Sequence, residues 1–246
     1  MNTRREFLRD AALVSGAVAT GACFAKPAEG DQTKSLLAPG AVVLFEGDSI
    51  TDAGRNKKSD APNDPDGMGR GYASLAAKGL HAEHPGWDLK CYNRGVSGNK
   101  VFQIAERWDG YCQQLKPDLI SILIGVNDFW HKLNGKYDGT IETYRTDYRA
   151  LLERTKRELP GTKLVLCEPF VLKVGAVDDR WFPDFPQYRN AAKALADEYA
   201  DAWVPFQEAL DKACESKPPQ RWAHDGVHPT PAGAQVMADA WLKAVG

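Results

Sequence analysis

The stretch VVLFEGDSITD, residues 42–52, decides the fold that the sequence predicts. Its first four residues are apolar and begin with two β-branched valines, which is typical of a fully buried strand. The strand then stops abruptly at the small polar cluster Gly47-Asp48-Ser49. Open α/β sheets bind their ligands beyond the carboxyl ends of parallel strands, so Ser49 is a candidate functional residue. The alternative is an ordinary strand-to-helix turn in which Asp48 or Ser49 is the helix N-cap.

The composition of the chain is that of an ordinary globular protein. It has 246 residues, of which 43% are hydrophobic and 26% are charged, and its formal net charge is −2. This length favours a single α/β domain with a sizeable core. The balanced charge gives no basic surface for nucleic acid, and no run beyond the N-terminus is long and apolar enough to span a membrane.

The first 25 residues predict an export signal. Twin arginines at positions 4 and 5 precede the weakly apolar run Ala11–Ala22. This pattern resembles a twin-arginine signal, which directs a protein to the periplasm or the exterior. Cleavage after Ala25 is one reading, and lipoprotein processing at Cys23 is the other.

No metal or cofactor is predicted. Asn63, Asp64 and Asp66 suggest a calcium loop, but Pro62 and Ala73 occupy the positions where an EF-hand requires carboxylates. The cysteines beyond the signal have long, irregular spacings that do not suit a metal cluster. Two of them lie in predicted strands and are expected to be core residues, while a disulfide after export stays open. The four are Cys91, Cys112, Cys167 and Cys214.

The remainder of the chain alternates strands and helices. Residues 26–40 form a polar lead-in, and residues 41–246 are expected to form one domain. Such alternation without internal repeats is typical of a parallel sheet with helices on both faces. After the first strand, strands are predicted at 87–92, 117–125, 163–167 and 202–204, and helices at 72–84, 101–115, 141–159, 186–199 and from Thr230 onward.

Small polar clusters follow several of these strands, which places them on one rim of the sheet. There a serine hydroxyl needs a base to take its proton, and the base needs an orienting acid. A tetrahedral oxyanion needs preorganised donors. Ser49, His228, Asp225 and Asn127 supply these groups, together with backbone N–H groups of glycine-rich turns. The structural alternatives are that Asn127 caps a turn, Asp225 pairs with Arg221, and His228 belongs to an ordinary loop.

Four sequence blocks resemble, in order, those of the SGNH (GDSL) hydrolase family. The resemblance covers the whole chain after the signal and implies a three-layer α/β/α sandwich with a five-stranded parallel sheet of flavodoxin-like order. In the first block Ser49 is followed by Ile50, whereas the letters GDSL of the family name have leucine there. This difference leaves the expected roles of the block intact. The blocks are Gly47-Asp48-Ser49, Gly98 after Ser97, Gly125-Val126-Asn127-Asp128, and Asp225 with His228 three residues later.

The resemblance also implies roles for these residues. Ser49 would be the nucleophile, His228 the base and Asp225 its orienting partner. The N–H groups of Ser49 and Gly98 and the side-chain amide of Asn127 would hold the oxyanion. The family chemistry requires no cofactor.

The strings GDSITDAGR (47–55), NRGVSGN (93–99) and IGVNDFW (124–130) look like the acetylxylan esterase branch of the family. Trp130, Trp181 and Trp222 could stack on sugar rings or could instead pack the loops that carry them. No long aliphatic segment is available to line an acyl tunnel, which favours acetyl esters. The expected substrate is therefore an acetylated oligo- or polysaccharide. The alternatives are a lysophospholipase or thioesterase, and a non-catalytic carbohydrate-binding protein on the same scaffold.

Overall fold

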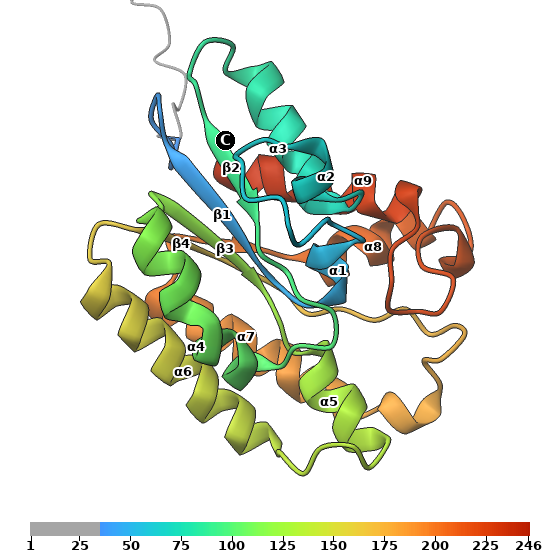
Figure 1. The fold of residues 1–246 in the computed structure, drawn as a ribbon. Coiled ribbons are helices and arrows are strands. Elements are labelled where there is room, and N and C mark those ends of the chain that lie inside the picture. The colour runs from blue at the N-terminus through green and yellow to red at the C-terminus, as the bar shows by residue number, and fades with distance from the viewer. Residues whose placement is uncertain (1–34) are drawn as a thin grey trace, which may run out of the picture. The chain divides into compact units, whose positions relative to one another are not determined.

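The computed structural model describes residues 35–246, which form a five-stranded parallel sheet between two layers of helices (Figure 1). The strands lie in the order β2-β1-β3-β4-β5, and every neighbouring pair is parallel. The expected α/β/α sandwich of flavodoxin-like order is confirmed. The strands are β1 (Val42–Gly47), β2 (Lys90–Asn93), β3 (Leu119–Leu123), β4 (Lys163–Cys167) and β5 (Ala202–Val204).

The two central strands, β1 and β3, are buried on both faces. Every residue of β3 is buried, as are all residues of β1 after Val42. Continuous burial explains why these strands are unbroken aliphatic runs rather than alternating patterns. Gly47 pairs with Leu123, and Phe45 pairs with Asn93 at the end of β2. The carboxyl ends of three strands therefore meet at one edge of the sheet, which we call the rim.

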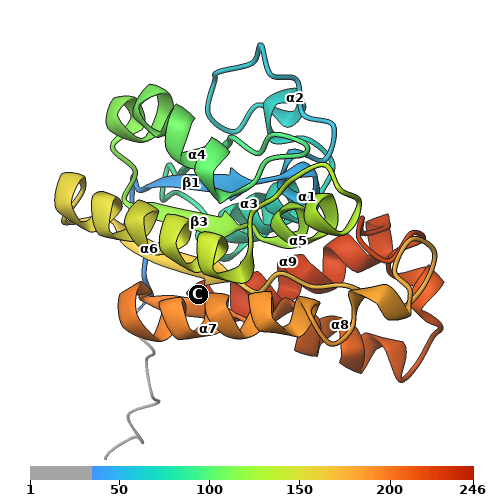
Figure 2. The same cartoon turned by 90° about the horizontal axis from the view of Figure 1, so that it is seen from below.

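Helices cover both faces of the sheet, as Figures 1 and 2 show. On one face, the indole of Trp241 in α9 packs against Phe45 with ring centroids 5.0 Å apart, and its Nε1–H donates to Ser121 Oγ at 2.9 Å. The C-terminal helix thus completes the core beneath β1. The helices of this face are α3 (Tyr72–Glu83), α8 (Phe206–Cys214) and α9 (Pro231–Val245), and those of the other are α4 (Val101–Trp108), α6 (Ile141–Glu158) and α7 (Phe185–Tyr199).

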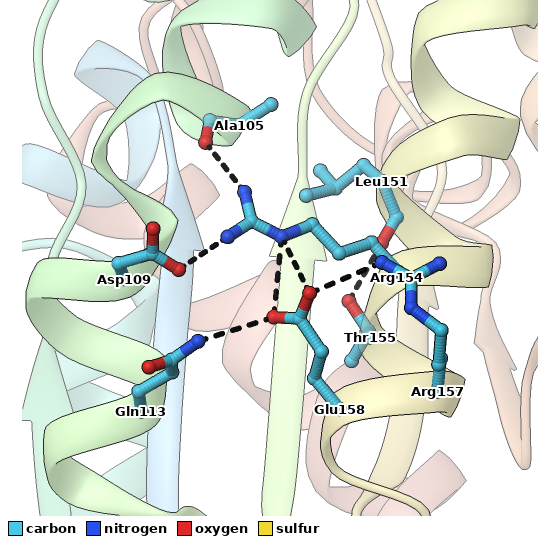
Figure 3. Close-up of polar contacts among 8 residues, drawn as sticks. All are labelled: Ala105, Asp109, Gln113, Leu151, Arg154, Thr155, Arg157 and Glu158. Atoms are coloured by element: carbon cyan, nitrogen blue, oxygen red, sulfur yellow. Dashed lines mark hydrogen bonds and ion pairs between the residues drawn. The ribbon is translucent and has the colours of Figure 1, made fainter.

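On the second face, Arg154 of α6 joins α6 to α4 (Figure 3). Its guanidinium donates to both carboxylate oxygens of Glu158, at 3.1 and 3.2 Å, and to the Ala105 carbonyl at 3.3 Å. It also contacts Asp109, in the π-helical turn Asp109–Gln113 that continues α4. Because α4 begins just after the turn that carries Gly98, this cluster fixes the helix behind that turn.

Short helices occupy the rim, where the sequence predicts only polar turns. Helix α1 (Ser49–Asp52) follows β1 and α5 (Val126–Leu133) follows β3, while α2 (Pro65–Met68) precedes α3. The polar residues that look like turn formers are the first residues of these helices.

Strand β2 begins at Lys90, three residues later than predicted. The indole of Trp87 stacks on His84 with ring centroids 3.9 Å apart, so Trp87 packs back on the end of α3. Helix α8 was not predicted. Thr230, where the sequence predicts the start of a helix, is the N-cap of α9, and its Oγ1 accepts the Gly233 N–H at 3.2 Å.

Within residues 35–246, no helix is long and apolar enough to cross a membrane. The same residues contain no group of three or more histidine, cysteine or acidic side chains that could hold a metal. Cys91 and Cys167 are buried in β2 and β4, as predicted for core residues, and burial raises the pKa of each thiol to about 12. All four cysteines within residues 35–246 are free thiols in the structure.

The predicted export signal and Cys23 lie outside the described residues, as does most of the lead-in. The described end of the lead-in is held against the domain. Leu37 is buried in the core, and the Leu36 N–H donates to the carbonyl of Val245 at 3.4 Å.

Candidate active site

Ser49 is the first residue of α1, directly after the strand that carries it to the rim. Asp48 is the N-cap, and its Oδ1 accepts the Ile50 N–H at 2.9 Å. A side chain at Gly47 would collide with the Thr51 hydroxyl and with the Leu123 carbonyl, so only glycine fits between the strand and the helix. The tight turn therefore fixes where the Ser49 hydroxyl lies.

His228 and Asp225 lie beside this hydroxyl in a continuous hydrogen-bonded chain. Ser49 Oγ is 2.8 Å from His228 Nε2, and His228 Nδ1 is 2.6 Å from Asp225 Oδ2. Asp225 Oδ1 also accepts the backbone N–H groups of Val227, at 2.9 Å, and His228, at 2.7 Å. The carboxylate is thus fixed by its own loop and orients the imidazole so that Nε2 faces the hydroxyl.

Partial burial disfavours the charged form of Asp225, but its hydrogen bonds outweigh that effect. The donors are His228, through its side chain and its backbone, and the N–H of Val227, and they hold the pKa of Asp225 below its usual value. The carboxylate therefore stays ionised at neutral pH, where it can stabilise an imidazolium. This arrangement can activate Ser49 as a nucleophile.

Gly98 lies in a turn that is anchored on both sides, and its φ of +83° favours glycine. On one side, the N–H and Oγ of Ser97 donate to Asp52 Oδ2 of α1, at 3.1 and 2.8 Å. On the other side, the Asn99 carbonyl accepts from the side-chain amide of Asn127 at 3.2 Å. The structure therefore connects the other two predicted oxyanion donors, Gly98 and Asn127, to the segment that carries Ser49.

A buried ion pair that the sequence did not reveal supports the same turn. Arg107 of α4 lies 2.7 Å from Glu46 Oε2 on β1, and its Nε donates to Asn99 Oδ1 at 2.9 Å. Burial raises the pKa of Glu46 to about 7, even though Arg107 and other arginines favour its charged form. Arg107 thus connects the strand that carries Ser49 to the turn that carries Gly98.

Asp48 and Asp128 are two further buried carboxyl groups at the rim. Burial raises the pKa of each to about 7. Asp48 Oδ1 accepts the Ile50 N–H, and Asp128 Oδ1 accepts the N–H of Val101 at the start of α4. The Oδ2 atom of each carboxyl group has no hydrogen-bond partner among the described residues. These groups are partly protonated near neutral pH.

Replacing Asp48 with asparagine is expected to raise the free energy of unfolding, and by about 1–3 kcal/mol more near pH 8 than near pH 5. The pKa of Asp48 is about 7 in the folded chain, against 3.8 for the ordinary group. Between these values the folded chain keeps a proton that the unfolded chain releases, so stability falls as the pH rises through that window. Asparagine stays neutral and keeps the acceptor for the Ile50 N–H.

Urea unfolding at both pH values measures the effect, with exposed Asp138→Asn as the matched change of charge. An equal change in stability at both pH values would contradict the assignment of a raised pKa to Asp48.

The three tryptophans predicted as sugar-binding residues lie in different environments. Trp181 is fully buried among aromatic rings, and its Nε1–H donates to the Ala176 carbonyl at 3.0 Å, so the expectation that it contacts a sugar is wrong. Trp130 is half-buried and lies beside His228, with ring centroids 6.3 Å apart. Trp222 is half-buried and donates to the Lys217 carbonyl at 3.3 Å, without a described contact to Ser49 or His228.

A cavity of about 230 Å³ opens beside Ser49 and His228. Its walls are mostly apolar and include Ile50, Tyr72 and Pro229. Arg70 also lines it, a residue that the sequence did not single out.

Residues 45–236 match the GDSL-like Lipase/Acylhydrolase family. The chain is 31% identical over 214 residues to an acetylxylan esterase of Geobacillus stearothermophilus, and the match covers 85% of this chain and 96% of that enzyme. A solved structure of a candidate GDSL-like lipase from Parabacteroides merdae ATCC 43184 is 47% identical with a TM-score of 0.84, over 85% of this chain and 97% of that one.

Two further solved structures are catalytic mutants of Axe2, an acetylxylan esterase from Geobacillus stearothermophilus. A serine is replaced by alanine in one and a histidine in the other. Each is 30% identical with a TM-score of 0.77, and the match covers 86% of this chain and 96% of the mutant chain. The chain therefore belongs to the GDSL-like lipase/acylhydrolase family, and it is an SGNH-type esterase.

Proposed function

We propose that the protein removes acetyl groups from carbohydrate through an acyl intermediate on Ser49. The observation that carries this proposal is the chain of short contacts from Ser49 Oγ to His228, at 2.8 Å, and from His228 to Asp225, at 2.6 Å. Similarity to an acetylxylan esterase over most of both chains supports the acetyl and carbohydrate parts. A substrate of polymer size also fits the export signal predicted in residues 1–25.

In the first half-reaction, Ser49 Oγ attacks the acetyl carbonyl while His228 Nε2 takes its proton. The N–H groups of Ser49 and Gly98 and the amide of Asn127 donate to the oxyanion of the tetrahedral intermediate. Asp225 stabilises the imidazolium, which then protonates the departing sugar oxygen as the intermediate collapses to acetyl-Ser49. In the second half-reaction, His228 takes a proton from water, the hydroxide attacks the acyl group, and acetate leaves as Ser49 regains its proton.

The surroundings of Ser49 suit a short acyl group and a sugar. The cavity of about 230 Å³ beside Ser49 has room for an acetyl group next to the hydroxyl. The indole of Trp130, next to His228, offers a face on which the axial C–H groups of a sugar ring can stack. Trp222, which is only half-buried, is a second candidate at the periphery.

Replacing Asn127 with alanine is expected to lower kcat for p-nitrophenyl acetate by on the order of 10²- to 10³-fold, because one oxyanion donor is lost. The amide already donates to Asn99, so the position of the turn will also relax. Asn134→Ala, an exposed asparagine at the other end of α5, is the matched control. A loss of only a few-fold in steady-state kinetics would remove Asn127 from the oxyanion site.

The proposed function is tested by acetate release from acetylated xylan, pectin and mannan fragments, with Ser49→Ala as the control. A parallel series of p-nitrophenyl esters should show a maximum at acetyl or another short chain. A maximum at eight carbons or more would instead support the lysophospholipase or thioesterase alternative. Sugar binding without acetate release, and without labelling of Ser49 by a fluorophosphonate, would support the non-catalytic alternative.

A further inference from the structure

Arg70 places an unpaired positive charge in the wall of the cavity beside Ser49. Among the residues that line this cavity, Arg70 is the only arginine or lysine, and no aspartate or glutamate is present. In the part of the chain from residue 35 onward, no carboxylate lies within ion-pair distance of its guanidinium. The cavity therefore has one cation, no acid of its own to neutralise it, and an otherwise largely apolar wall.

The other arginines near the rim all have partners. Arg55 Nε donates to the Gly95 carbonyl at 2.8 Å, Arg94 lies 3.1 Å from Asp60, and Arg107 lies 2.7 Å from Glu46. These three contacts hold the rim together, and they explain why those arginines are there. Among residues 35–246, Arg70 has no such contact, so its position at the cavity needs a different explanation.

The backbone of Arg70 is fixed relative to Ser49, although its side chain is exposed. The Arg70 N–H donates to the carbonyl of Ala53 at 3.1 Å, and Ala53 is the C-cap of the short helix that begins with Ser49. The side chain thus starts from a backbone that is hydrogen-bonded to the end of the nucleophile's own helix. An arginine fork held in this way can reach a group on a molecule bound next to the scissile ester.

Arg70 also borders a second hollow of about 240 Å³, which Ser49 does not line. That hollow contains the carboxylate of Asp66, which repels an anion, whereas the cavity of Ser49 contains no carboxylate. An anionic group that pairs with Arg70 is therefore favoured on the Ser49 side.

We propose that Arg70 binds the carboxylate of a uronic-acid residue, so that the enzyme prefers acetylated acidic saccharides to neutral ones. This inference rests on the proposed carbohydrate esterase function and names its substrate class. The planar guanidinium matches a carboxylate with two parallel hydrogen bonds, which a neutral hydroxymethyl group cannot accept in the same way. Because the contact is remote from the reacting carbonyl, it acts equally on the bound substrate and the transition state and changes KM more than kcat.

The test compares acetate release from O-acetylated oligogalacturonides with release from the same oligosaccharides after methyl esterification, which removes the charge and little else. The wild-type ratio of kcat/KM, acidic over methylated, is expected to exceed one. Arg70→Gln should lower this ratio by roughly 10- to 100-fold, mainly through KM. Arg70→Lys, which keeps the charge but loses the fork, should fall between the two.

Arg145→Gln controls for the change in net charge, because Arg145 is exposed on α6 and pairs with Glu142, 2.9 Å away. It should leave the ratio at the wild-type value. Since Arg70 is exposed, raising the salt concentration from about 0.05 M to about 0.5 M should also lower the wild-type ratio toward that of Arg70→Gln. An unchanged thermal midpoint shows that each variant is folded.

Two outcomes overturn the inference, and they are distinguishable. Equal kcat/KM for the acidic and methylated substrates, with no change of ratio in Arg70→Gln, overturns the role of Arg70 and leaves the carbohydrate esterase in place. Hydrolysis of p-nitrophenyl acetate without acetate release from any saccharide overturns the proposed function, and this inference with it.

Discussion

Replacing Ser49 with alanine is expected to lower kcat for p-nitrophenyl acetate by on the order of 10⁴- to 10⁶-fold. The variant keeps His228 and Asp225 in their hydrogen-bonded geometry, but the atom 2.8 Å from Nε2 that attacks the ester is gone. The loss should appear in kcat rather than in KM, because the covalent step is removed while the binding surface is unchanged. A steady-state assay at high enzyme concentration detects the residual rate.

The same substitution should have little effect on folding. The hydrogen bond between Ser49 and His228 is exposed to solvent, so its loss costs about 1 kcal/mol or less of unfolding free energy. Ser216→Ala, which removes an exposed hydroxyl far along the chain, is the matched control. A fluorophosphonate should label the wild type and Ser216→Ala and fail to label Ser49→Ala. Retained turnover in Ser49→Ala, or labelling at another residue, would exclude Ser49 as the nucleophile.

Replacing Arg107 with methionine is expected to lower the free energy of unfolding by about 3–5 kcal/mol near pH 8, the usual result of removing one partner from a buried ion pair. Glu46 has 1% of its side chain exposed and would be left without its cation. The loss should be smaller near pH 5, because the folded chain then holds Glu46 in its neutral form. Urea unfolding of the variant at both pH values measures the difference.

A double variant makes this prediction specific to the pair. Glu46→Gln combined with Arg107→Met removes the buried charge as well as its partner, so it should recover much of the stability that Arg107→Met loses. Additive losses in the double variant would show that Arg107 stabilises the protein by packing alone. Because Arg107 also holds Asn99, whose carbonyl holds the Asn127 amide, kcat should stay below the wild-type value even where stability is recovered.

The sequence predicts best those features that depend on neighbouring residues. The bounds of β4 and β5 agree with the prediction, because each is a short, largely apolar run bounded by polar residues or by proline. Thr230 is predictable as a cap, because its hydroxyl and the proline after it act within one turn of the helix. The positions of Ser49, Asp225 and His228 follow from family motifs, and the structure brings these three residues together.

Features that depend on distant residues were missed. Trp181 lies in an irregular segment whose sequence has no periodicity. The neighbouring sequence therefore does not reveal that Phe129, Phe185 and Trp130 pack around it. Glu46 looks like the polar end of a strand until Arg107 is placed beside it. Arg70 stands alone between two glycines, where only the position of α1 shows that it faces the cavity of Ser49.

Because α9 closes the core over β1, the order in which the chain is synthesised limits when this enzyme can form. The hydrogen bond from Ser49 to His228 joins residues 179 positions apart, and Trp241, which covers Phe45, lies in α9, which follows all five strands in the sequence. Contacts of such long range make folding slow. Until α9 leaves the ribosome, the aliphatic central strands remain uncovered on one face and prone to aggregation. Esterase activity is therefore expected only after α9 has been synthesised and has packed on the sheet.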